Sequence, residues 1–547
     1  PVRFSNGIAH TRWATHGRPN KVNAHPHTDC SGNLYVVHNG IIENFEELKA
    51  QLRDSGHVFV SETDTEVIAH LIEEYNGSDL KSAVLKAVSR LEGSFAICVI
   101  SKNEPDTLIG ARKDSPLVAG IAEDGVYLAS DSLALVPYTD KEICLQDGEI
   151  ISISNGKLEI CDGTGTCRPA KPTPILISSQ DADKGEYEHY MLKEIYEQPR
   201  ILRHLIQTHI QKDSVRLPDI GLTREQLKKV RKVRIVACGT AYHAGLVGKY
   251  LLEKIGGVDV EIDVSSEFRY RHCRIRKGDL VVAISQSGET ADTLAAVKRF
   301  REQGANVISV CNVLGSSLIR VSDGYIHTAS GPEIGVASTK AYTSQVLSLF
   351  FLALYWGQLK KTVSSQQRMD LLNELAKIPR NVQDILETSR QTVEHIAAHY
   401  SSFGCFLFLG RGLNYPTAME GALKLKELSY IPAEGYAAGE MKHGPIALID
   451  EYRAVVCVAL RDSLYDKMFS NIQEIKARQG KVVALINRGD KKIKNVADEY
   501  IELPVCREEC SPLLAAIPLQ LLAYYIAHNL GYDIDKPRNL AKSVTVE

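Results

Sequence analysis

Residues 279–300 read DLVVAISQSGETADTLAAVKRF, a short apolar run followed by a segment with helical apolar spacing. Between the two stand Ser285, Gln286, Ser287 and Thr290, so small polar side chains and a glycine connect the expected strand to the expected helix. Such a loop can hold an anion, because the free N–H groups and the dipole of the following helix favour negative charge. An ordinary Ser/Thr helix cap is the alternative.

The same order of strand and helix occurs on both sides of this stretch. VRIVACG (233–239) precedes it and NVISVCN (306–312) follows it. A second series repeats the order, with GCFLFLGRG (404–412), AVVCVAL (454–460) and KVVALIN (481–487). Alternation of buried strands with helices is typical of parallel sheets with crossover helices. The sequence therefore predicts two similar α/β units in tandem.

The N-terminal part of the chain has a different pattern. From residue 6 to about residue 167, short β-type runs are broken by Gly and Asp turns, and helical spacing occurs at 44–55 and 65–74. This pattern predicts an α+β domain, and the three prolines of residues 168–185 indicate a linker after it. The expected organisation is an N-terminal domain at 1–167, a linker at 168–185, α/β units at 186–365 and 366–530, and a tail at 531–547.

Composition excludes several classes of protein. The chain has 547 residues, with 64 Lys and Arg against 67 Asp and Glu, which leaves no positive field for a nucleic acid. The apolar run at 346–356 is shorter than the ~20 residues of a membrane-spanning helix. No secretory signal is visible, and the 12 cysteines form no C-x-x-C pair. We expect a multidomain cytoplasmic protein with reduced thiols and no membrane partner.

Charged residues gather in the second α/β unit. Glu420, Lys424 and Glu427 are spaced i, i+4 and i+7, so they share one face of a helix. A solvated row of ion pairs is the alternative. His443 lies in a glycine-rich loop and Lys542 lies near the end of the chain. Each of these two, taken singly, is more often structural or solvated than catalytic.

Five stretches, SQSGETADTL, EIGVASTKAYT, EGALKLKE, GEMKHGP and PRNLAKSVTVE, together resemble the isomerase half of glutamine–fructose-6-phosphate aminotransferases. The resemblance implies two sugar-isomerase (SIS) units. It also implies that Lys542 forms an imine with the sugar, that Glu427 carries a proton between C1 and C2, and that Lys424 keeps Glu427 ionised. His443 would assist ring opening in the site of a neighbouring subunit. The implied phosphate and sugar contacts are Thr240, Ser285, Gln286, Ser287, Thr290, Val336 and Ser338.

The N-terminal runs HTRWATHG, NAHPH, HNG and SETD resemble the glutaminase domain of amidotransferases that use an N-terminal cysteine nucleophile. That cysteine does not occur here, so we expect a truncated domain that lacks its leading segment and does not hydrolyse glutamine. Trp13 would gate an ammonia passage. The residues implied to bind glutamine are Arg12, Thr15, His16, Asn39, Gly40 and Asp64. Asn39-Gly40 is also a common hairpin turn, and the histidines could suggest a metal, but they show no metal-ligand spacing, so none is expected.

Together the two resemblances imply an enzyme that transfers the amide nitrogen of L-glutamine to fructose 6-phosphate and isomerises the product to glucosamine 6-phosphate. No metal or organic cofactor is required, because side chains can carry out each step. A homodimer or larger homo-oligomer is implied. The alternatives are a sugar-phosphate isomerase or deglycase that acts without glutamine, and a sugar-phosphate-sensing regulator. Arg12, Asn39 and Asp64 favour the use of glutamine.

Overall fold

The computed structural model describes residues 6–77, 79–175 and 183–545. The chain divides into two compact units. The first unit contains the chain up to Asp183 together with two short later stretches, Glu289–Ala291 and the residues after Lys542. The second unit contains the remainder. Residues 176–182 of the expected linker lie outside the described part of the chain.

The first unit is a layered α+β domain. Its strands are β1 His27–Thr28, β2 Leu34–Ile42, β3 Gly93–Ser101, β4 Thr107–Lys113, β5 Val118–Ile121, β6 Val126–Ala129, β7 Lys141–Cys144, β8 Ile150–Ser154, β9 Lys157–Cys161, β10 Cys167–Arg168 and β11 Thr173–Pro174. Its helices are α1 Phe45–Asp54, α2 Glu66–Glu74, α3 Leu80–Val88 and the short η1 Ser132–Ala134. One sheet has the order β1-β2-β3-β4-β8-β9-β10, and a smaller sheet has the order β11-β7-β5-β6.

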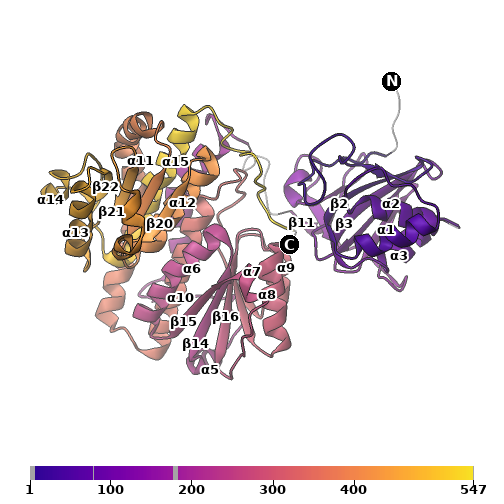
Figure 1. Cartoon of the computed structure of the whole chain (residues 1–547). Coiled ribbons are helices and arrows are strands. Elements are labelled where there is room, and N and C mark those ends of the chain that lie inside the picture. The colour runs from indigo at the N-terminus through magenta and orange to yellow at the C-terminus, as the bar shows by residue number, and fades with distance from the viewer. Residues whose placement is uncertain (1–5, 78, 176–182, 546–547) are drawn as a thin grey trace. The chain divides into compact units, whose positions relative to one another are not determined.

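The two faces of the larger sheet pack against different layers. Ile97 and Val99 of β3 belong to a core cluster with the apolar residues of α1, α2 and α3 (Figure 1). Ala96, on the opposite face of the same strand, belongs to a cluster with Ala119 and Ile143 of the smaller sheet. The split follows from the strand period of two, which sends successive side chains to opposite faces.

The helices expected at 44–55 and 65–74 are present as α1 and α2, whereas α3 was not predicted. Asp79 caps α3, because its side chain accepts a hydrogen bond from the Ser82 N–H. Two segments placed in the linker are short strands instead, since Arg168 pairs in β10 and Thr173–Pro174 pairs with β7.

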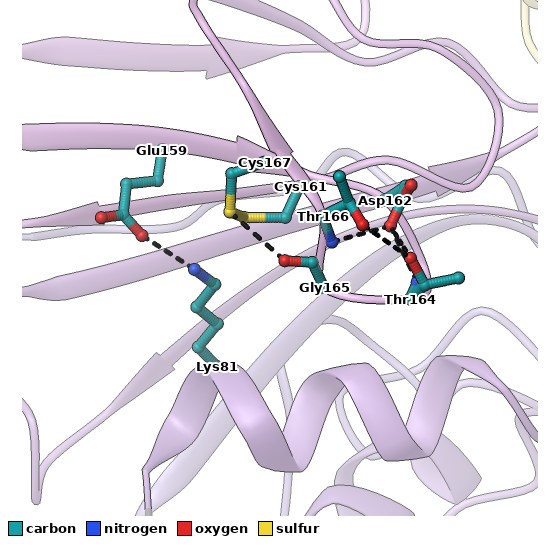
Figure 2. The surroundings of a disulfide bond; sticks show 8 residues. All are labelled: Lys81, Glu159, Cys161, Asp162, Thr164, Gly165, Thr166 and Cys167. Atoms are coloured by element: carbon teal, nitrogen blue, oxygen red, sulfur yellow. Dashed lines mark hydrogen bonds and ion pairs between the residues drawn. A yellow bond between two sulfur atoms is a disulfide. The ribbon is translucent and has the colours of Figure 1, made fainter.

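A disulfide connects Cys161 and Cys167 across the pair β9 and β10 (Figure 2). The turn between them is held by Asp162, whose carboxylate accepts hydrogen bonds from the N–H groups of Thr164 and Thr166. This bond corrects the expectation that the thiols are reduced, while the other ten cysteines are free. The sequence offered no signal, because the pair is separated by six positions and meets only through the register of the two strands.

The second unit contains two parallel sheets. Its main strands are β14 Lys232–Ala237, β15 Asp259–Val264, β16 Asp279–Ser285, β17 Asn306–Cys311, β18 Gly324–His327, β19 Phe406–Gly410, β20 Ala433–Ala437, β21 Ala454–Val458, β22 Lys481–Asn487 and β23 Glu499–Leu503, with a small pair β12 Ile210–Gln211 and β13 Ser214–Val215. The sheet orders are β15-β14-β16-β17-β18 and β20-β19-β21-β22-β23. Because strand order and parallel direction are the same in both sheets, the expected duplication is confirmed.

Helices cover both faces of each parallel sheet. They are α4 Tyr190–His209, α5 Arg224–Lys229, α6 Gly239–Leu251, η2 Leu252–Gly256, α7 Ser265–Phe268, α8 Ala291–Glu302, α9 Ser317–Val321, α10 Lys340–Lys360, α11 Ser365–Tyr400, α12 Asn414–Ser429, η3 Ala438–His443, η4 Pro445–Leu448, α13 Tyr465–Lys476, α14 Lys491–Lys494, η5 Glu508–Cys510 and α15 Ser511–Asn529. Helix α8 covers the outer face of one sheet and α13 that of the other (Figure 1). The inner faces share one large core with α6, α10, α12 and α15.

Two apolar helices lie in this shared core. The run at 346–356 is part of α10 and is buried throughout apart from the partly buried Tyr355, as expected for a core helix. Residues 508–529, which include α15, are long and apolar enough to cross a membrane by composition, and the whole apolar window is buried inside the protein. Such burial is typical of the core helix of a globular protein.

We expect Phe350→Ala to lower the free energy of unfolding of the second unit by about 3–5 kcal/mol, because Phe350 is fully buried in the shared core and its loss leaves a cavity. Urea unfolding followed by circular dichroism measures the change. Phe350→Leu is the matched control and should cost less, since it keeps most of the buried volume. Equal stability of the alanine variant and the unsubstituted chain would contradict this placement of Phe350.

Candidate active site

The polar loop that follows β16 is tightly held. Gly288 has φ +69°, and a Cβ atom there would lie 2.1 Å from the Ser316 hydroxyl oxygen, so only glycine fits. The Gly288 N–H donates to the buried Ser285 hydroxyl over 3.0 Å. The carbonyl of Gln286 accepts a hydrogen bond from the N–H of Asn312 over 3.2 Å. The loop is thus preorganised before α8, as an anion-binding turn requires.

Lys542 is anchored by its side chain. Its Nζ donates to Glu333 Oε2 over 2.6 Å and to the carbonyl of Gly335 over 2.8 Å. Glu333 is fully buried, and its other oxygen accepts N–H groups from Thr339 and Ala341 where α10 begins. Burial alone would raise the pKa of Glu333, but the Lys542 ammonium and these hydrogen bonds outweigh it and lower the pKa to about 2.

The charged face of α12 is buried. Glu420 is 2% exposed and Lys424 is 1% exposed, which excludes the solvated row of ion pairs. Lys424 Nζ lies 2.5 Å from Glu427 Oε2 and 3.6 Å from Glu420 Oε1. Burial opposes the charge of Lys424, yet the carboxylates of Glu427 and Glu420 raise its pKa above the ordinary value. Thr240 Oγ1 donates to Glu420 Oε1 over 3.1 Å, and His243 Nδ1 lies 2.8 Å from Glu420 Oε2.

Residues 285–288 of the loop, the charged residues of α12 and Lys542 belong to the second unit. Asn312, whose N–H binds the carbonyl of Gln286 in the polar loop, also donates from its side chain to the carbonyl of Gly331 over 2.8 Å. Gly331 lies two residues before Glu333, the partner of Lys542. The negative charge of Glu333 also acts on the ammonium of Lys424. The structure therefore brings the loop, the α12 charges and the terminal lysine together.

The remaining expected sugar contacts vary in position. Val336 and Ser338 are half-buried just before α10, and the Val336 N–H donates to the carbonyl of Asp535 over 3.0 Å. Ser287 and Thr290 are half-buried in the loop.

His443 is exposed at the end of η3. Among the described residues it has no hydrogen bond or ion pair to Lys542 or to the charged residues of α12. The structure thus does not place His443 with the other catalytic candidates of the same chain.

Three functional candidates escaped sequence reasoning, namely Glu333, Glu194 and His243. Glu194 on α4 accepts hydrogen bonds from the N–H groups of Ile334 and Gly335. Burial, followed by the nearby charge of Glu333, raises the pKa of Glu194 to about 8. An isolated acidic residue within the small and apolar stretch GPEIGVAS was the available signal for Glu333.

The glutamine-type candidates lie in the first unit. Asn39 and Gly40 are inside β2, where they pair with Ala96 and Phe95, so the hairpin-turn alternative is wrong. A Cβ atom at Gly40 would lie 2.0 Å from the carbonyl oxygen of Ser94, which requires glycine there. Asn39 Oδ1 is 2.7 Å from Nε2 of His10.

His10 connects Asn39 to Arg12. The Arg12 N–H donates to Nδ1 of His10 over 2.9 Å, so the His10 proton must sit on Nε2, where it donates to Asn39. The Arg12 guanidinium donates to the carbonyls of His16 and Gly17. The Arg12 side chain is thereby held by the backbone of the segment for which the sequence predicts a glutamine pocket.

The other expected residues of this pocket differ in exposure. Asp64 is buried, accepts the N–H of Ile42 over 2.9 Å, and lies 3.8 Å from Nδ1 of His16. Thr15 is exposed, and Trp13 is 43% exposed. The structure thus brings His16 and Asp64 together.

Acid should destabilise the first unit through His25. Burial, followed by the charges of His10 and His27, lowers the pKa of His25 to about 2. As the pH falls, the unfolded chain therefore takes up a proton on His25 before the folded chain does. The contribution of His25 to the free energy of unfolding is complete above pH ~6.5 and declines below it, by at most about 1.4 kcal/mol per pH unit. Thermal unfolding between pH ~7.5 and ~5.5 should show a weaker pH dependence for His25→Gln than for the unsubstituted chain. The exposed His395→Gln is the control, and equal slopes for all three proteins would contradict the assignment.

Comparison with known proteins identifies the domains to which both groups of residues belong. Residues 226–355 and 405–530 match the family model of the SIS domain, and residues 10–137 match that of a glutamine amidotransferase domain. The glutamine–fructose-6-phosphate aminotransferase [isomerizing] of Caldanaerobacter subterraneus is 47% identical, over 99% of this chain and 89% of the relative. The enzyme of the same name from Aquifex aeolicus is 48% identical, over 100% of this chain and 89% of the relative.

A solved structure matches the second unit. The C-terminal domain of glucosamine-fructose-6-phosphate aminotransferase from Francisella tularensis is 41% identical with a TM-score of 0.62, and the match covers 65% of this chain and all of that domain. These matches do not confirm the expectation of a truncated glutaminase domain without its leading segment. The amidotransferase model, the pair of SIS domains and the two full-length relatives lead to one assignment: this chain belongs to the family of isomerizing glutamine–fructose-6-phosphate aminotransferases.

Proposed function

We propose that the chain transfers the amide nitrogen of L-glutamine to fructose 6-phosphate and isomerises the product to glucosamine 6-phosphate, with release of glutamate. The observation that carries the proposal is the position of Lys542. Its amine is bound to a buried carboxylate, Glu333, whose charge also acts on the Lys424–Glu427 ion pair. A nucleophilic amine and a carboxylate base in one region are what imine formation and proton transfer require.

The sugar chemistry follows from these groups. After the Lys542 ammonium has given one proton to solvent, its amine adds to the C2 carbonyl of the open ketose, and loss of water forms an imine. Ammonia then displaces the lysine from C2. The carboxylate of Glu427 removes a proton from C1 and the proton returns at C2, which leaves an aldose with an amine on C2. Lys424 holds Glu427 in place through the ion pair at 2.5 Å.

The polar loop would bind the phosphate of the same sugar. Ser285, Gln286, Ser287 and Thr290 precede α8, and the backbone N–H groups at a helix N-terminus favour a phosphate. Thr240, Val336 and Ser338 would contact the sugar. Support comes from the rigid turn at Gly288 and from the polar connection of this loop to the segment that holds Lys542.

The first unit would supply the ammonia. Arg12 would bind the carboxylate of glutamine, Asp64 its ammonium group, and Asn39 with the Gly40 N–H would stabilise the oxyanion. Thr15 and His16 would complete the pocket, and Trp13 would gate the ammonia passage. His10 bridges the Asn39 side chain and the backbone N–H of Arg12. This bridge supports the proposed glutamine-binding residues, because it fixes the orientation of the side-chain amide of Asn39.

Assembly as a homodimer or larger homo-oligomer belongs to the same proposal. His443 is exposed, and in its own chain it is not bonded to the Lys542 cluster among the described residues. It could therefore assist ring opening only in the site of another copy or after a rearrangement. A cytoplasmic location also stays a prediction.

The proposal is tested with the full chain and two substrates. Fructose 6-phosphate alone should yield glucose 6-phosphate, which reports the ketose–aldose step. Fructose 6-phosphate with L-glutamine should yield glucosamine 6-phosphate, measured by mass spectrometry, when an N-terminal cysteine nucleophile is present, because no residue of this chain is assigned that role. Formation of the aldose without any amino sugar by a protein that carries this cysteine would favour the isomerase that acts without glutamine. Absence of both products would refute the assignment of Lys542 and Glu427.

A further inference from the structure

We propose that Cys30, His57, His70 and Glu73 form a binding site for a divalent transition metal of the zinc class in the first unit. Cys30 lies between β1 and β2, and His57 follows α1. His70 and Glu73 are one turn apart on α2. The four ligand atoms all lie within 4.8 Å of one another.

The spacing of the ligand atoms fits tetrahedral coordination. Cys30 Sγ is 3.7 Å from Nδ1 of His57 and 3.5 Å from Nδ1 of His70. Glu73 Oε2 is 3.0 Å from Nδ1 of His57 and 3.2 Å from Nδ1 of His70. A tetrahedral zinc ion with ordinary bond lengths separates sulfur from nitrogen by about 3.6 Å and nitrogen from oxygen by about 3.3 Å. Both imidazoles therefore present the same nitrogen to one point.

The second nitrogen of each histidine faces a carboxylate. Nε2 of His57 lies 2.9 Å from Glu74 Oε2, and Nε2 of His70 lies 3.7 Å from Glu66 Oε1. Carboxylates in this position fix the tautomer and ring orientation of metal-bound histidines and make the ligand more basic. Only His57 makes this hydrogen bond, since the buried Nε2 of His70 has no hydrogen-bond partner at 3.7 Å. The Glu74 partner of His57 is an independent sign of a metal site, because it leaves Nδ1 of that ring available as a ligand.

Charge and ligand type select the metal. A thiolate at Cys30 and the carboxylate of Glu73 together neutralise a divalent ion. One sulfur and two imidazole nitrogens favour zinc-class metals, whereas magnesium and calcium prefer oxygen ligands. The other cluster of potential ligands in the described part of the chain, Glu159 with Cys161 and Cys167, does not qualify because its cysteines form the disulfide.

The alternative is a hydrogen-bonded cluster without metal. Glu73 Oε2 also accepts the backbone N–H of Cys30 over 3.0 Å, so this carboxylate can serve as a shared acceptor for the imidazoles. The sequence showed no metal motif here, because the ligands come from three segments and only His70 and Glu73 are close in the chain. A bound metal would hold the segments of Cys30 and His57 against α2. The first turn of α2 lies just after Asp64 in the chain.

Cobalt binding by the full chain tests the site. After treatment with a chelator, we expect one equivalent of Co²⁺ to bind with a thiolate-to-cobalt charge-transfer band, and Zn²⁺ to displace it. Cys30→Ser should lose the band, while Cys273→Ser, at a partly buried free cysteine of the second unit, should keep it. Glu74→Gln should weaken binding about 10–100-fold. Glu46→Gln, at an exposed position of α1, should leave it unchanged.

Several results would overturn the proposal. They are binding of less than one equivalent by the unsubstituted chain, a charge-transfer band that persists in Cys30→Ser, or equal affinities of Glu74→Gln and Glu46→Gln. Cys30 is exposed, so its replacement by serine should not prevent folding, and circular dichroism checks this. His57→Asn is the second variant, and retention of full affinity by it would equally reject the site.

Discussion

Lys542→Arg should reduce the conversion of fructose 6-phosphate to glucose 6-phosphate by at least about a thousandfold while the chain keeps its fold. Arginine retains the positive charge opposite the buried Glu333 carboxylate, so no unpaired charge is left in the interior. Its guanidinium cannot lose a proton at neutral pH and cannot form the imine. The measurement is the rate of aldose phosphate formation, with thermal unfolding as the check on folding.

The comparison with Lys542→Ala separates the effect of losing the positive charge from the effect of losing the nucleophilic amine. The alanine variant should be as inactive as the arginine variant but less stable, because Glu333 then lacks its cation. Lys536→Ala, at an exposed lysine of the same tail, is the matched control and should retain activity. Undiminished isomerisation by Lys542→Arg would refute the imine role, whatever its stability.

The parts of the fold that could be predicted are those set by local patterns. The apolar strands of 279–285 and 454–458 and the helices that follow them have clear periods, so the duplicated parallel sheets were predictable. Helix α3 was missed although the predicted helix α2 has the same length of nine residues, so length does not explain the difference. The disulfide depended on strand register, which the sequence does not state.

The candidate site was predictable only in part for a similar reason. Lys542, Lys424 and Glu427 lie in recognisable stretches, but their importance depends on partners far away in the chain. Glu333 is 209 positions from Lys542, and Glu194 is 140 positions from the N–H of Ile334 that it binds. Sequence spacing cannot show such contacts, nor the burial that raises the pKa of Glu194 and the Lys542 ammonium that lowers the pKa of Glu333.

Glu427→Gln should lower the isomerisation rate by about 10²–10⁴-fold, because the amide cannot accept the C1 proton. The KM for fructose 6-phosphate should change far less than kcat, since the polar loop and Lys542 are intact. Imine formation should also persist, so borohydride should still trap the sugar on Glu427→Gln but not on Lys542→Arg. Trapping is measured by the mass of the intact chain.

The contrast between these two variants is the strongest test of the divided roles. If Glu427 served only to neutralise Lys424, its replacement would remove the partner at 2.5 Å and leave that buried ammonium with Glu420 at 3.6 Å, so stability would fall and trapping would fall with it. A proton carrier predicts the opposite, namely full trapping with lost turnover. Glu387→Gln, an exposed carboxylate on α11, should change neither quantity. Full turnover by Glu427→Gln would show that another group moves the proton.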